Sequence, residues 1–83
     1  MRFVLQVSIS PQVDGQGYLA VCPSLQGCHA EGSTVGAALD NLQDVARTLL
    51  ELRKEDGLPI PEGIVAGEGP EGAMDGRLAV NVS

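Results

Sequence analysis

Aromatic side chains are nearly absent from this 83-residue sequence, which has one Phe, one Tyr and no Trp. A hydrophobic core must therefore be built from Val, Leu, Ile and Ala. Proteins that hold single-stranded nucleic acid stack its bases on aromatic rings, so base stacking is not an expected function. The length is that of one domain, covering residues 1–83.

Basic residues are also scarce. Five Lys and Arg face eleven Asp and Glu, which gives a net charge of −6 and an isoelectric point near 4.4. Phosphate contacts need clustered Lys and Arg, so we expect no direct binding of nucleic acid. An acidic surface attracts a basic protein, although the same charge also suits simple solubility. Both interpretations stay open at this point.

No apolar run approaches the roughly 18 residues of a membrane span. The opening "MRFVLQVSIS" lacks the apolar core and cleavage site of a secretory signal. Two cysteines are too few for a disulfide-stapled scaffold and are expected to be reduced. We therefore expect a cytoplasmic protein with no membrane association.

Turn residues divide the chain into short segments. Pro11 ends a first alternating segment, Asp14-Gly15 is typical of a hairpin turn, and Pro23 with Gly27 brackets a second connection. Residues 62–76 are rich in Gly and Glu and are expected to form a loop. Strands are predicted at 3–9, 17–22, 28–31 and 77–82.

From Thr34 the apolar period changes from 2 to about 3.6, which predicts an amphipathic helix of about 22 residues. Thr34 is the expected N-cap, and Gly57 with Pro59 and Pro61 is expected to end the helix. The predicted apolar stripe contains Val35, Ala38, Leu39, Leu42, Val45, Ala46, Leu49 and Leu50.

The order of elements is β-β-β-α-β, and we predict an α+β fold. A three-stranded meander followed by a right-handed crossover gives one mixed four-stranded sheet of order 3-2-1-4, whose last strand runs parallel to the first. The single helix covers one face of that sheet. The other face is left open, which favours a homodimer or homotetramer.

The stretch "CPSLQGCHAEGST", 22–34, allows a metal site, a catalytic thiol or a turn. Cys22, Cys28 and His29 are one ligand short of a four-ligand zinc site. Cys22 and His29 could face each other across a hairpin, but no Asn or Asp is placed to orient the imidazole. The turn interpretation is favoured, with no catalytic residue, metal or cofactor expected, and a cysteine-dependent enzyme remains a lesser alternative.

The same stretch, with Tyr18 before it and "ALDNL" and "GLPIP" after it, resembles the HicB antitoxin family, also described as UPF0150-like. The resemblance covers about residues 16–61. Its motif positions here are Tyr18, Pro23, Leu25, Gly27, Cys28, Glu31, Gly32, Thr34, Ala38, Leu39, Asn41, Gly57, Leu58, Pro59 and Pro61.

This resemblance implies a partial ribonuclease-H-like fold and the neutralisation of a HicA-type toxin, a small basic RNA-cleaving protein. An acidic antitoxin suits such a partner electrostatically. Many members carry a C-terminal DNA-binding segment, whereas a strand is expected at this C-terminus, so autorepression is not part of the expectation. An orphan oligomeric ligand-binding or scaffold module remains the alternative.

Candidate partner contacts are exposed polar residues of two surfaces. On the open sheet face they are Tyr18, His29 and Glu31. On the outer side of the helix they are Asp40, Asp44 and Glu51.

Overall fold

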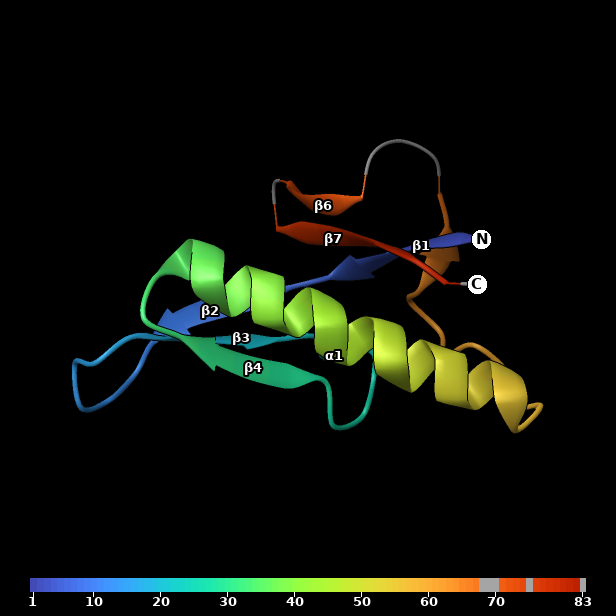
Figure 1. Ribbon diagram of the computed structural model, residues 1–83, viewed down its shortest axis with the longest axis horizontal. Coiled ribbons are helices and arrows are strands. Elements are labelled where there is room, and N and C mark those ends of the chain that lie inside the picture. The colour runs from blue at the N-terminus through green and yellow to red at the C-terminus, as the bar shows by residue number, and fades with distance from the viewer. Residues whose placement is uncertain (68–70, 75, 83) are drawn as a thin grey trace.

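The computed structural model describes residues 1–67, 71–74 and 76–82 (Figure 1). The predicted first strand is divided at Val7 into β1 (Arg2–Gln6) and β2 (Ser8–Pro11). β2 continues into an antiparallel meander with β3 (Tyr18–Val21) and β4 (His29–Gly32), in the order β2-β3-β4. The meander predicted from the turn residues is confirmed, but it contains only the second half of the first strand.

A second sheet has the order β5-β1-β7-β6. Its other strands are β5 (Val65–Ala66), β6 (Gly72–Met74) and β7 (Arg77–Asn81). β7 runs antiparallel to β1, so the predicted single sheet with a parallel last strand is wrong. The reason lies in 62–76, where β5 and β6 form although a loop was predicted. The chain reverses direction between β5 and β6 and again at Gly76, between β6 and β7. After these two reversals β7 runs in the same direction as β5, and both are antiparallel to β1. Positions 68–70 and 75 of the predicted loop lie outside the described residues.

The one helix among the described residues, α1 (Val35–Glu55), begins and ends as predicted. The Thr34 side chain accepts a hydrogen bond of 3.0 Å from the backbone N–H of Ala37. At the other end Gly57 has φ +71°, and its N–H and that of Leu58 donate to the carbonyls of Lys54 and Arg53. This is a Schellman C-cap, which satisfies carbonyls that the helix itself cannot pair.

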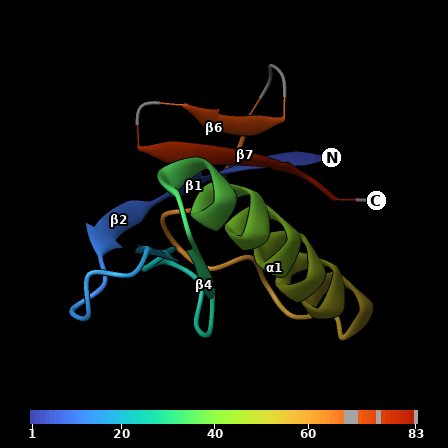
Figure 2. The same ribbon diagram turned by 60° about the vertical axis from the view of Figure 1, so that its left-hand side comes forward.

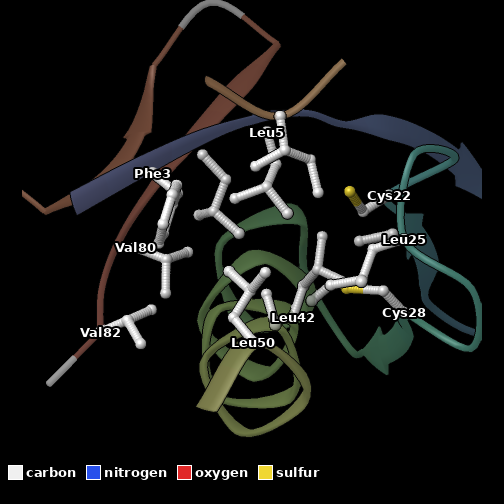
Figure 3. Packing of buried hydrophobic residues seen from close by; sticks show 14 residues of the cluster. Phe3, Leu5, Cys22, Leu25, Cys28, Leu42, Leu50, Val80 and Val82 are labelled. Atoms are coloured by element: carbon white, nitrogen blue, oxygen red, sulfur yellow. The ribbon is translucent and has the colours of Figure 1, made fainter. Parts of the chain in front are cut away.

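Helix α1 packs against both sheets and joins them into one core (Figures 1 and 2). Ala38, Leu42, Ala46 and Leu50 are fully buried along one helix face. Side chains from β1, β7 and the connection between β3 and β4 meet them (Figure 3). The labelled ones are Phe3, Leu5, Val80, Val82, Cys22, Leu25 and Cys28.

Candidate interaction surface

The connection between β3 and β4 is a turn whose apolar side chains point into the core. Cys22 donates its backbone N–H to the carbonyl of Cys28 at 2.9 Å, which extends the β3–β4 pairing by one row. Leu25 donates to Cys22 and Cys28 donates to Leu25. Cys22, Leu25 and Cys28 are all buried (Figure 3). The turn interpretation of this stretch is therefore confirmed.

The two thiols differ in acidity because they share a hydrogen bond. That bond lowers the pKa of Cys22 to about 7, with help from the backbone N–H groups of Ser24 and Leu25. The same bond, together with burial, raises the pKa of Cys28. His29 is exposed and pairs with Val21, so it lies on the other face of the hairpin from both thiols. The structure does not bring Cys22 and His29 together.

A metal-binding group of three or more His, Cys, Asp or Glu residues is not found in the described part of the chain. Within the same residues, no helix is long and apolar enough to cross a membrane.

The acidic residues predicted on the helix lie together on the face opposite the core. Asp40, Asp44 and Glu51 share one side of α1, since their spacing of four and seven residues returns to nearly the same angle. Asp40 and Asp44 are exposed and Glu51 is half-buried. We call these three residues the acidic ridge.

Arg47 also lies on this side of the helix, where its guanidinium contacts both the acidic ridge and the second sheet. It contacts Asp44 at 3.1 Å and Glu71 at 2.8 Å, and it donates through Nε to the carbonyl of Asn81. Glu71 accepts a further hydrogen bond from the N–H of Asn81 at 2.7 Å. The Arg47 guanidinium holds the pKa of Glu71 below its usual range. Arg47 therefore ties α1 to β7 and balances part of the charge at Asp44. The three carboxylates of the acidic ridge still outnumber this one guanidinium, so the ridge keeps a net negative charge.

An apolar strip runs beside the acidic ridge. Val45 and Leu49 are half-buried, and Leu52 is 48% exposed. A shallow depression of about 290 Å³ lies there, lined by Asp44, Val45, Thr48 and Leu49. We call Val45, Leu49 and Leu52 the apolar flank. Carboxylates beside an apolar depression can bind a basic protein surface through both charge and burial.

The apolar flank was missed in the sequence. Val45 and Leu49 were assigned to the buried stripe, and Leu52 falls outside it. The sequence did contain a signal for the apolar flank. Apolar residues cover a wider arc of the helix than the narrow stripe that is fully buried, which runs from Ala38 to Leu50.

The candidate residues of the sheet do not share one surface. His29 and Glu31 are exposed on the same side of β4, where they pair with Val21 and Leu19. Tyr18 is half-buried and packs against the core cluster. Strand alternation places Tyr18 on the side of Ala20 and Cys22, away from Glu31. Of the three contacts predicted on the sheet, His29 and Glu31 therefore lie on an exposed face, and Tyr18 does not.

The motif residues serve turns, caps and close packing. Gly27 has φ +78° in the β3–β4 turn, and Asn41 donates its side-chain amide to the carbonyl of Glu31 at 2.8 Å. Gly32 lies so close to the helix that a Cβ atom there would be 2.6 Å from the carbonyl carbon of Ala37. Among the other motif positions, Pro23 lies in the turn, Thr34 and Gly57 lie at the helix ends, Ala38 lies in the core, and Pro59 follows the helix.

Comparison with known proteins gives two relatives, both from Synechocystis sp. (strain ATCC 27184 / PCC 6803 / Kazusa). The chain is 34% identical to UPF0150 protein ssr1765 over 56 residues, which is 68% of this chain and 70% of the relative. It is 36% identical to UPF0150 protein ssl0738 over 62 residues, covering 71% and 85% of the two chains. No family model and no solved structure matches.

Proposed function

The chain belongs to the UPF0150 protein family, and on that premise we propose that it is a HicB-like antitoxin. It neutralises a small basic RNA-cleaving toxin of the HicA type by direct protein–protein contact. It acts in the cytoplasm as a homo-oligomer and as a binding protein, without catalysis, metal or cofactor. We also propose that its meander followed by a helix corresponds to part of the ribonuclease-H-like arrangement expected of such antitoxins.

The observation that carries this proposal is the acidic ridge beside the apolar flank, on a chain of net charge −6. A protein that binds RNA uses Lys and Arg against phosphates. Carboxylates fixed on a helix can occupy those same cations, and Leu52 and Leu49 can bury apolar surface beside them. This chain and RNA then compete for the same basic surface of the toxin.

Ribonuclease chemistry in this chain itself is not part of the proposal. Metal-dependent phosphodiester cleavage needs carboxylates that converge on the metal ions. Strand β1 reads RFVLQ and β7 reads RLAVN, and neither contains an Asp or Glu.

The test is co-purification of the tagged chain from its own cells in moderate salt, with mass spectrometry of what stays bound. We expect to recover a basic protein of fewer than about 100 residues in a stoichiometric amount. This protein should cleave RNA once it is released, and its cleavage of RNA should stop when the chain is added back. Recovery of the chain alone, or of a partner without RNA-cleaving activity, would overturn the proposal.

The surface is tested separately with one charge reversal and a matched control. Asp40→Lys should weaken toxin binding about tenfold at low salt and less at high salt, because it turns an attraction into a repulsion. Glu62→Lys makes the same charge change at an exposed residue beyond the helix and should leave affinity nearly unchanged. Equal loss in both variants would show that net charge acts without the acidic ridge.

A further inference from the structure

Two titratable groups of the core have no part in the proposed function. Cys22 and Cys28 are both free thiols, and they flank the turn that joins β3 to β4. Because Val21 pairs with His29, the two cysteines lie directly opposite each other one row further along. The 2.9 Å backbone bond from Cys22 to Cys28 continues the ladder there, and both side chains point into the core (Figure 3). We call these two residues the thiol pair.

The position of the thiol pair suits a disulfide. Opposite residues in a hydrogen-bonded antiparallel row have Cα atoms about 5.5 Å apart, and disulfides join Cα atoms that are about 4.4–6.8 Å apart. The Cβ atoms of such a row lie about 5 Å apart, whereas a relaxed disulfide holds them at about 3.8 Å. A disulfide between Cys22 and Cys28 is therefore within reach but strained, and strained disulfides are readily reduced.

The hydrogen bond within the thiol pair gives its two members different chemistry. It lowers the pKa of Cys22 to about 7, so much of this thiol is ionised at neutral pH. The thiolate is the form that attacks an oxidant. The same bond, together with burial and the charge of Cys22, raises the pKa of Cys28. Once Cys22 is oxidised it carries no charge, so Cys28 can then give up its proton and attack in its turn.

We propose that the thiol pair is a reversible redox switch that hydrogen peroxide closes. The Cys22 thiolate attacks one peroxide oxygen, the O–O bond breaks, and the other oxygen leaves as hydroxide, which takes up the proton that Cys22 had lost. Cys28 then attacks the sulfur of the resulting sulfenic acid, the S–O bond breaks, and water leaves as the disulfide forms. Two thiols and one peroxide thus give one disulfide and two waters. A small dithiol reverses the change by exchange, because it is oxidised to a cyclic disulfide and its protons pass to Cys22 and Cys28.

Access to the thiol pair requires the β3–β4 turn to open, because both sulfur atoms are buried and a buried thiol reacts slowly. The turn itself lies at the surface. Pro23, Gln26 and Gly27 are exposed, and backbone bonds donated by Leu25 and Cys28 hold the turn closed. Oxidation therefore follows local opening of the turn. The disulfide, once formed, opposes that opening, so the switch sets how readily the end of the β3–β4 hairpin opens beneath α1.

The inference does not depend on the toxin, and it is tested on the full chain alone. The reduced protein is treated with hydrogen peroxide, its remaining thiols are alkylated after denaturation, and intact mass with peptide mapping identifies the products. We expect both thiols to disappear together in a product linked between Cys22 and Cys28 of one chain, and dithiothreitol to restore both in the native protein. Dimedone, which traps sulfenic acids, should label Cys22 when it is present during oxidation. Thiols that survive excess peroxide, links between chains, dimedone on Cys28, or a disulfide that dithiothreitol leaves intact would overturn the proposal.

A matched pair of glycine variants tests access through the turn. Gly27 has φ +78° and Gly15, in the β2–β3 turn, has φ +75°, and an added Cβ atom would meet nothing within 4 Å at either position. Alanine is strained in this conformation, so each variant loosens its own turn. Gly27→Ala should speed oxidation about tenfold, whereas Gly15→Ala should leave the rate within about twofold of wild type. Equal acceleration by both variants, or none by Gly27→Ala, would overturn the proposal that the β3–β4 turn admits the oxidant.

Discussion

Replacement of Gly32 by alanine should destabilise the fold strongly, although alanine is the smallest possible addition. Gly32 ends β4, and α1 passes directly over it. A Cβ atom there would lie 2.6 Å from the carbonyl carbon of Ala37 and 2.8 Å from the Cα of Ala38. These neighbours are backbone atoms of a capped helix, so no side-chain rotation can relieve the overlap. The helix must move away from β4, which loosens the packing of Ala38.

Overpacking of a close-packed interior costs about 1–3 kcal/mol, and a backbone overlap belongs at the upper end of that range. A domain of this size is stable by roughly 4–12 kcal/mol. A loss of about 3 kcal/mol should lower the melting temperature by about 12–24 °C, at 4–8 °C per kcal/mol. Thermal and urea unfolding followed by circular dichroism measures both quantities.

Gly36→Ala is the matched control, because it adds the same methyl group four residues later. Its nearest neighbour would be the Thr34 hydroxyl oxygen at 3.9 Å, an ordinary contact, and Gly36 lies within the helix. Alanine there should stabilise the protein by about 0.5–1 kcal/mol. If Gly32→Ala unfolds at the wild-type temperature, or if both variants shift in the same direction, the reasoning about close approach is refuted.

Two further perturbations test the helix cap and the tie between α1 and β7. Thr34→Ala should cost about 1 kcal/mol, because the N–H of Ala37 loses its acceptor, while Thr34→Ser should retain most of that stability in urea titrations; equal losses would argue against the cap. Arg47 lowers the pKa of Glu71 below its unfolded value of about 4.3. The carboxylate therefore contributes stability above that pH and loses it as the pH falls through the folded pKa. The melting-temperature difference between wild type and Glu71→Gln should be full at pH 7 and shrink below about pH 4, and a difference that does not depend on pH would contradict the ion pair.

The helix could be predicted closely because its signals are local. Thr34, the change of period and Gly57 each act within one or two turns, and the structure follows all three. The break at Val7 could not be predicted, because the alternation of apolar residues continues from Phe3 to Ile9 without a fault. Only the distant carbonyl of Gly76 marks the point where one sheet ends and the next begins.

The direction of β7 was mispredicted for a related reason. The 62–76 stretch shows no apolar periodicity, so the sequence gives no local sign of β5 and β6. The rule of the right-handed crossover assumes that one helix connects two parallel strands directly, whereas here β5 and β6 lie between α1 and β7. The candidate surface was partly predictable. Asp40, Asp44 and Glu51 share a helix face by spacing alone, whereas the exposure of Leu52 and the inward orientation of Tyr18 depend on how far the sheets extend beneath the helix.

The division of the strands into two sheets has a consequence for how the chain folds. The meander joins partners close in sequence, such as Tyr18 with Gly32, whereas the other sheet joins Met1 to Val82, which are 81 residues apart. The entropy lost on closing a loop grows with the logarithm of its length, so the β1–β7 pairing carries the larger closure cost. We expect the meander and α1 to form first and the sheet of the chain ends to close last. The amides of β7 should then exchange with solvent through partial openings that leave β3 and β4 protected.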